Sequence, residues 1–278
     1  MPVSAPANSE IFAGNRAFGR IAFSVAAATG ASRRRHVHEA GALRVRFPNA
    51  AGQSGLDAVI VNTAGGMTGG DRFAIDIGVE TGARLTVTTA AAEKVYRSLG
   101  PDTGIDVKLD VGPGAALAWL PQQTILFDQA RLRRTIDAQV APGARLLLAE
   151  GVVFGRSAMG ETVTQGYFSD HWRVRRDGTL VFAETLRLDG AIAQKLQERA
   201  VAAGGVAVAS VLKLPGDEQD VAAVRAMATD FAGEVGISTW NGVAVARLVA
   251  PDGAALHHDL IGVLTALSDE PLPRLWLN

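Results

Sequence analysis

The 278-residue chain contains no cysteine. Without a thiol it cannot form a disulfide, a zinc finger or an iron–sulfur cluster, and it cannot use a thiolate nucleophile. Any transition metal would have to be held by histidine, carboxylate or backbone oxygen atoms. Thiol chemistry is therefore excluded before any motif is considered.

The chain also lacks an excess of charge, because its formal net charge is −1. Neither nucleic acid nor an anionic membrane surface is expected as a partner. No run of about 20 apolar residues is present, so no membrane-spanning helix is expected either. The short apolar stretch 21–28 resembles the core of a signal peptide, but three arginines follow at 33–35 and its residues alternate in polarity, as in a half-buried strand. The expected location is the cytoplasm.

Strict alternation of apolar and polar residues is the dominant pattern that is present. It is clearest over residues 73–80 and 105–111, where every second side chain is Phe, Ile, Leu or Val. Such a period of two indicates strands with one face buried and the other solvated. The sequence therefore predicts a mainly β protein.

A Gly-Ala-x-Leu pattern recurs where strands are expected to turn. Copies begin at Gly82, Gly114 and Gly143, which are 32 and 29 residues apart, and a fourth begins at Gly253. Glycine at a corner adopts backbone angles that other residues resist. A spacing near 30 suggests stacked two-strand units, which predicts a β-helix-like fold or an extended stacked β-sandwich. Such corners are also common by chance in a chain rich in Gly and Ala, so this reading competes with coincidence.

Helical patterns are confined to the C-terminal third. Apolar residues share one helix face over 220–235, where Asp217 or Asp220 is expected to cap the helix and Gly236 to end it. A second short helix is expected over 259–267, and a β-hairpin around residues 177–178. We expect residues 1–14 to form a loose leader and residues 15–278 a single elongated β-rich domain.

The glycine-dense run at residues 62–71 follows an apolar strand, so a phosphate-binding loop has to be considered. The dinucleotide motif needs a different glycine spacing and a following helix, and a Walker loop needs Lys-Ser or Lys-Thr after its last glycine. Here Asp71-Arg72 and then a strand follow. Both kinds of phosphate site are excluded.

Other polar groups give weaker indications. Residues 155–160 resemble a nucleophile elbow with one residue too many, which leaves a β-rich hydrolase using Ser157 or a carboxylate pair as the alternative function. His36 and His38 would share one face of a strand and are weak metal candidates, although a solvated basic edge beside the three arginines is the preferred interpretation. Arg131, Arg133 and Arg134 are interpreted as the wet face of a strand.

Four ordered stretches resemble the urease accessory protein D family (UreD, called UreH in some species). They are residues 62–71, 88–98, 119–128 and 155–161, and the segments 43–48 and 273–276 extend the similarity. The resemblance covers roughly residue 19 to the C-terminus. One departure is Gln123, which stands where the family usually has Glu, so a direct metal-binding role there is in doubt while a hydrogen-bonding role survives.

The resemblance implies a protein that is not an enzyme. Members of the family are urease maturation chaperones that bind the urease apoprotein and recruit the accessory proteins F and G. The complex delivers Ni²⁺ to the urease active site, and the D protein offers the ion a passage. The implied protein has no cofactor of its own, carries Ni²⁺ only in transit, and has a mainly β fold with a couple of α-helices.

Weakly binding oxygen and nitrogen groups suit an ion in transit, because tight ligation would trap it. The family motifs supply such groups, and we expect no stable metal site, with Asp71 and Glu93 as the weak carboxylate candidates. The residues predicted to line the passage or to support it are Thr63, Gly65, Gly66, Thr68, Gly69, Gly70, Asp71, Thr88, Thr89, Glu93, Lys94, Tyr96, Arg97, Gln122, Gln123, Thr124 and Glu150.

A structural reading stands beside each of these. The glycines would also serve a tight crossover between strands, and Glu93, Lys94, Tyr96 and Arg97 would also form a charged network that fixes a loop. A purely structural β-scaffold is thus a third hypothesis.

Overall fold

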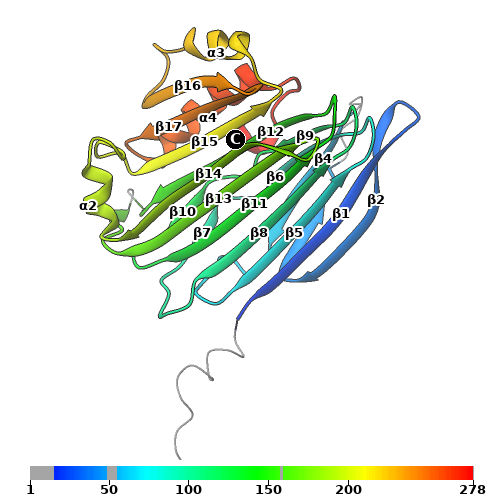
Figure 1. The fold of residues 1–278 in the computed structure, drawn as a ribbon. Helices are drawn as coiled ribbons and strands as arrows, with labels where there is room; N and C mark the ends of the chain where they lie inside the picture. Colours follow the sequence, from blue (N-terminus) through cyan, green and yellow to red (C-terminus); the bar gives the residue numbers. More distant parts are fainter. Residues whose placement is uncertain (1–15, 49–54, 157–158, 278) are drawn as a thin grey trace, which may run out of the picture.

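The computed structural model describes residues 16–48, 55–156 and 159–277. Within these residues the chain forms seventeen β-strands and three α-helices, so the mainly β prediction is confirmed. The expected leader over residues 1–14 lies outside the described residues, as does Ser157. The strands make two sheets that lie over one another, with the helices gathered at one side (Figure 1).

Sheet A contains seven strands, of which the inner five run parallel. Its two edge strands, β2 and β14, pair antiparallel with their neighbours. In sheet order the strands are β14 (Thr179–Gly190), β13 (Gly166–Arg176), β11 (Arg131–Val140), β8 (Thr103–Val111), β5 (Arg72–Val79), β1 (Phe18–Ala28) and β2 (Ala31–Gly41).

Sheet B lies opposite and has a parallel centre made of β4, β6, β9 and β12. Two short strands, β7 (Glu93–Val95) and β10 (Thr124–Leu126), pair with each other, and β10 also pairs with β12. The main path is β16 (Glu234–Trp240), β17 (Val243–Ala250), β15 (Ala207–Leu214), β12 (Arg145–Phe154), β9 (Ala116–Trp119), β6 (Arg84–Thr89), β4 (Leu56–Asn62) and β3 (Leu43–Arg46).

The chain alternates between the sheets, so that β5–β6, β8–β9 and β11–β12 are successive coils of a solenoid. Gly82, Gly114 and Gly143 turn each coil with φ of +70°, +64° and +73°. Neighbouring corners are hydrogen-bonded, as where the Gly82 amide donates to the Pro113 carbonyl at 3.0 Å. The predicted repeat of about 30 residues is therefore one coil of the solenoid. Glycine recurs at each corner because it adopts these positive φ angles readily.

The fourth predicted corner is wrong. Gly253 begins helix α4 (Gly253–Leu267), because the Asp252 side chain accepts hydrogen bonds from the amides of Ala254 and Ala255 and so caps a helix. The same sequence pattern thus serves a helix N-terminus when an aspartate precedes it.

The other helix predictions are correct in place and wrong in extent. Helix α4 begins six residues before the predicted start at 259. Helix α3 (Glu218–Arg225) has Asp217, one of the two predicted caps, as its N-cap, but it ends ten residues early, and Val235 lies in β16. A third short helix, α2 (Ile192–Gln197), joins β14 to β15. The predicted hairpin is present, since β13 and β14 meet at Asp177-Gly178.

Two apolar clusters hold the elements together. The larger fills the space between the sheets, and the smaller packs α3, α4 and Trp276 against the outer face of sheet B. The inner residues of β5 and β8, such as Ile77 and Leu109, are the alternating apolar residues that the sequence singled out. The interior of the solenoid is therefore apolar, and each polar side chain inside it requires an explanation.

Candidate functional site

The glycine-rich run at 62–71 carries the chain from β4 in sheet B to β5 in sheet A. Its middle is hydrogen-bonded to β7, since the Met67 amide donates to the Lys94 carbonyl at 2.7 Å. A Cβ on Gly66 would lie 2.4 Å from the Tyr96 ring, and one on Gly69 would lie 1.9 Å from the Ser98 hydroxyl. These two glycines allow backbone and side chains to pack closely, which is the crossover role weighed from the sequence.

Asp71 closes this crossover. Its carboxylate is buried and accepts hydrogen bonds from the amides of Ala17 and Thr68, each at 2.8 Å. The Thr103 hydroxyl donates to the Thr68 carbonyl at 2.7 Å and ties the same loop to β8. Both Asp71 oxygens are engaged by the protein's own backbone, so this residue supports the site and is a poor metal ligand.

Gly69→Ala is expected to lower the free energy of unfolding by about 1–3 kcal/mol, because its methyl group would have to displace Ser98 and the Pro101 carbonyl. The control is Gly78→Ala, whose Cβ would meet only Ser24 at 3.5 Å. Urea unfolding followed by circular dichroism measures both. Equal stability of the two variants would contradict the close-packing role of Gly69.

The lumen between the sheets contains a small cavity of about 50 Å³ beneath this crossover. Its wall is mostly apolar but includes a set of polar side chains contributed by both sheets. Five of the predicted site residues lie in this set, which comprises Asn62, Thr89, Glu93, Gln122, Thr124, Arg134 and Glu150. The structure thus brings together residues up to 88 positions apart in the chain. The cavity that they line is here called the first cavity.

Glu93 and Asn62 lie at the crossover side of the first cavity. The Asn62 side-chain amide donates to Glu93 Oε2 at 3.0 Å. Burial raises the pKa of Glu93, and the hydrogen bond from Asn62 offsets part of that rise. Across from them, the Thr89 hydroxyl accepts from the Gln122 amide at 2.9 Å. This end of the cavity therefore offers oxygen atoms that are already partly hydrogen-bonded.

A second cavity of about 110 Å³ lies further along the lumen, between β12–β15–β17 and β13–β14. Its polar lining includes Asp170, Glu184, Ser210 and Arg247. Glu184 accepts from Arg247 through Oε1 at 2.8 Å, whereas its buried Oε2 has no hydrogen-bond partner among the described residues. A buried carboxylate oxygen without a partner is costly, so it marks a place where a donor or cation is favoured.

The two cavities meet at Arg134 and Glu150, which are the residues that line both. The Arg134 guanidinium lies between two carboxylates: Nη1 donates to Glu150, while Nε and Nη2 donate to Asp170 at 3.1 and 2.5 Å. Trp119 Nε1 donates to the other Glu150 oxygen at 2.9 Å. Each of the three charged side chains is buried.

Burial controls the charge of this cluster. Desolvation raises the pKa of Glu150 to about 7, although Arg134 opposes that rise. For Arg134, desolvation lowers the pKa, but the attraction of Asp170 and Glu150 outweighs it and the net direction is upward. Arg134 therefore stays protonated, and Glu150 titrates near neutral pH.

Arg134 is the clearest correction to the sequence analysis. The wet-face interpretation is wrong for this residue, which alternates with Leu132 and Ile136 on the inner face of β11. The strand pattern contained that information, because Arg134 occupies the phase of the apolar residues. Asp170, Glu184, Asn62 and Trp119 were also missed, and for Asp170 the same signal exists between Phe168 and Trp172.

The remaining predicted residues lie around the lumen and not in it. Gln123, the residue before β10, donates to the Gly253 carbonyl at 3.0 Å and so connects this segment to the start of helix α4. Thr88 is buried with no hydrogen-bond partner for its hydroxyl among the described residues. The others lie in or against the crossover, mostly exposed: Thr63, Gly65, Thr68, Gly70, Lys94, Tyr96 and Arg97.

The two histidines at 36 and 38 are exposed on edge strand β2, far in the sheet order from the lumen cluster. Within the described residues, no group of three or more His, Asp or Glu side chains is placed to hold a metal ion. Because Ser157 lies outside these residues, the elbow geometry and the hydrolase alternative stay a prediction.

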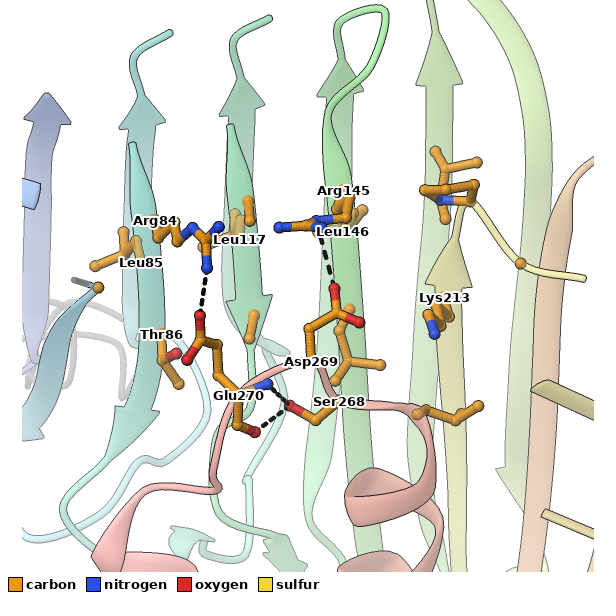
Figure 2. A pocket seen from close by; sticks show the side chains of 18 of the residues that line it. Arg84, Leu85, Thr86, Leu117, Arg145, Leu146, Lys213, Ser268, Asp269 and Glu270 are labelled. Atoms are coloured by element: carbon orange, nitrogen blue, oxygen red, sulfur yellow. Dashed lines mark hydrogen bonds and ion pairs between the residues drawn. The ribbon is translucent and has the colours of Figure 1, made fainter. Parts of the chain in front are cut away.

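A further hollow of about 340 Å³ lies on the outer face of sheet B (Figure 2). Arg84 and Arg145 face it from β6 and β12, and they pair with Glu270 at 2.6 Å and Asp269 at 3.4 Å. Lys213 is likewise paired, with Asp220 at 2.7 Å. Because its cations are already neutralised by acids of the same chain, this hollow is a weaker candidate than the lumen.

Comparison with known proteins gives a consistent result. Residues 17–277 match the family described as UreD urease accessory protein. The chain is 57% identical to the urease accessory protein UreD of Rhodopseudomonas palustris strain HaA2 over 272 residues, covering 98% of this chain and 97% of that protein. It is 54% identical to the UreD of Bradyrhizobium diazoefficiens over 270 residues, covering 97% of each.

Proposed function

The chain belongs to the UreD family of urease accessory proteins, and on that premise we propose that it helps to pass Ni²⁺ to apo-urease through the lumen between its two sheets. The family name gives it a role in urease maturation and describes an accessory protein, not a catalyst. No helix within the described residues has the length and apolar character needed to cross a membrane. The proposed place of action is the cytoplasm.

The observation that supports the passage is the file of carboxylates along the lumen. Glu93 lines the first cavity, Glu150 lines both cavities, and Asp170 and Glu184 line the second. The four side chains come from four different strands, so the fold and not a single motif collects them. These four carboxylates give the lumen groups that attract a small cation, with Arg134 and Arg247 as the two cationic side chains among them.

The chemistry of the lining fits an ion in transit. Carboxylate, amide and hydroxyl oxygens bind Ni²⁺ more weakly than imidazole or thiolate, and no three of the acids converge into a metal site within the described residues. Conduction requires binding that is favourable enough for entry and weak enough for release. Partly hydrogen-bonded carboxylates meet that requirement.

The remaining parts of the proposal concern partners. We propose that the protein acts as a scaffold that binds the urease apoprotein and the accessory proteins F and G, with Ni²⁺ as cargo and no cofactor of its own. Co-elution of the purified protein with the F protein in size-exclusion chromatography tests this part. Separate elution of the two, together with full urease activity in a deletion strain, would remove it.

Ser210→Phe is expected to reduce nickel-dependent urease activation at least tenfold, because the ring would fill the second cavity beside Glu150. The measurement is urease activity after mixing apo-urease, the accessory proteins and Ni²⁺. Ser238→Phe is the matched control, since it makes the same change at an exposed position of β16.

Unchanged activation by Ser210→Phe, with an unfolding midpoint like that of Ser238→Phe, would rule out transit through the lumen. A purely structural scaffold would then explain the data better, because a scaffold needs only the outer surface. Reduced activation in both variants would indicate a general effect on stability, and circular dichroism would show it.

A further inference from the structure

Arg134 stands where the two cavities of the lumen meet. Its side chain is only 3% exposed and lines both cavities together with Glu150. Both neighbours along β11 on the same face, Leu132 and Ile136, are buried apolar residues. The guanidinium therefore lies at the junction of the two cavities.

The contacts of Arg134 join the two sheets. Asp170 lies opposite Arg134 in the β11–β13 register, so the two-pronged contact through Nε and Nη2 stays within sheet A. Nη1 crosses the lumen to Glu150 on β12 and reaches the Thr124 hydroxyl on β10 at 3.5 Å, both in sheet B. The Arg134 side chain therefore bridges the two sheets across the lumen, with two of its three nitrogen atoms bound in sheet A and one in sheet B.

A guanidinium in this position is at odds with the passage of a cation. It repels a divalent ion at short range in a poorly solvated space, and it occupies the carboxylate oxygens to which that ion would bind. A purely structural ion pair would not need to lie between two cavities. The position and the charge together point to a control of passage.

We propose that Arg134 is the gate of the lumen, closed in the free protein and open when the guanidinium as a whole turns away from Glu150 and remains paired with Asp170 alone. This inference rests on the proposed passage of Ni²⁺. Breaking the contact to sheet B leaves Arg134 paired in sheet A, so opening does not strand an unpaired buried charge on the arginine. It also frees Glu150 to accept the ion.

The first test measures Ni²⁺ binding to the purified protein by equilibrium dialysis. In Arg134→Gln the carboxylates of Glu150 and Asp170 lose their cation, and we expect one Ni²⁺ bound per chain at least tenfold more tightly than in the wild type. Adding Glu150→Gln to that variant is expected to remove the gain. Loss of folding cannot produce a gain that depends on Glu150, whereas unchanged Ni²⁺ affinity of a folded Arg134→Gln would overturn the gate.

The second test covers the case in which Arg134→Gln does not fold. Arg134→Lys keeps the positive charge beside Asp170 but has a shorter, single-headed donor that withdraws from Glu150. We expect its rate of Ni²⁺ incorporation into apo-urease to rise at least threefold. A rate equal to or below that of the wild type, in an experiment where Ser210→Phe still blocks transfer, would overturn the gate and leave the passage intact. If Ser210→Phe transfers at the wild-type rate, the passage itself fails.

Discussion

Arg134→Met is expected to lower the free energy of unfolding by about 3–5 kcal/mol, the usual cost of breaking a buried ion pair by removing one partner. The variant keeps most of the apolar volume of the side chain but leaves Glu150 and Asp170 buried without a counter-charge. Urea unfolding at pH 7.5, followed by circular dichroism, measures the loss.

The control for this prediction is Arg133→Met, one position along the same strand. Arg133 is exposed, so its replacement is expected to change the stability by less than about 0.5 kcal/mol. A triple variant, Arg134→Met with Glu150→Gln and Asp170→Asn, should recover part of the loss because no buried charge remains. Equal stability of Arg134→Met and Arg133→Met would show that the cluster does not contribute as the contacts indicate.

Glu150→Gln is expected to have an effect that depends on pH. Burial raises the pKa of Glu150 from 4.5 to about 7 in the folded protein, so between those values the folded state holds a proton that the unfolded state has released. The contribution of Glu150 to stability is therefore full below pH 4.5 and lost as the pH rises through about 7. The loss corresponds to about 3 kcal/mol, because one pKa unit equals about 1.4 kcal/mol.

The difference in unfolding free energy between the wild type and Glu150→Gln isolates this effect from other titrating groups. It should change by about 3 kcal/mol between pH 4.5 and pH 8, with the variant gaining relative to the wild type as the pH rises. The control is Ser238→Ala at an exposed position of β16, which changes no titrating group and should leave a flat difference. Parallel curves for the wild type and Glu150→Gln would contradict the raised pKa.

The sign of this effect is informative about function. The cluster of one arginine and two acids carries a net buried charge of −1 when Glu150 is ionised, and Glu150→Gln removes that charge. A variant that is more stable above pH 7 but slower in nickel transfer would show that Glu150 is kept for transport at the expense of stability. Such a trade-off is expected of a residue whose role is to meet a cation.

The sequence predicted local features of the fold more successfully than contacts between residues far apart in the chain. Residues 73–80 and 105–111 were predicted as strands because their alternation is local and survives any arrangement of neighbours. The corners at Gly82, Gly114 and Gly143 were predicted because positive φ is a property of one residue and its turn. The start of α3 was likewise narrowed to a cap at Asp217 or Asp220, whereas its end was missed although Gly233 inside the predicted span disfavours a helix there.

The glycine-rich run at 62–71 is a clearer case of what the sequence could not decide. Its glycine spacing excluded a phosphate-binding loop. The spacing did not decide whether the run lines the proposed passage or supports it. The tertiary structure places Gly66 and Gly69 against Tyr96 and Ser98, so these glycines are part of the support, while Asn62 at the start of the run reaches Glu93 in the cavity. Contacts about 30 residues apart made that distinction.

The sequence by itself determined that this protein is mainly β with a small C-terminal helical part and resembles an accessory family, because alternation, glycine corners and ordered motifs are local features of the chain. Only the tertiary structure decided that Arg134, Glu150 and Asp170 meet, since these residues are 16 and 36 positions apart and lie on three strands of two sheets. The reason is register: one residue of slip would turn each of these side chains to the opposite face, and no local pattern fixes the register across the lumen.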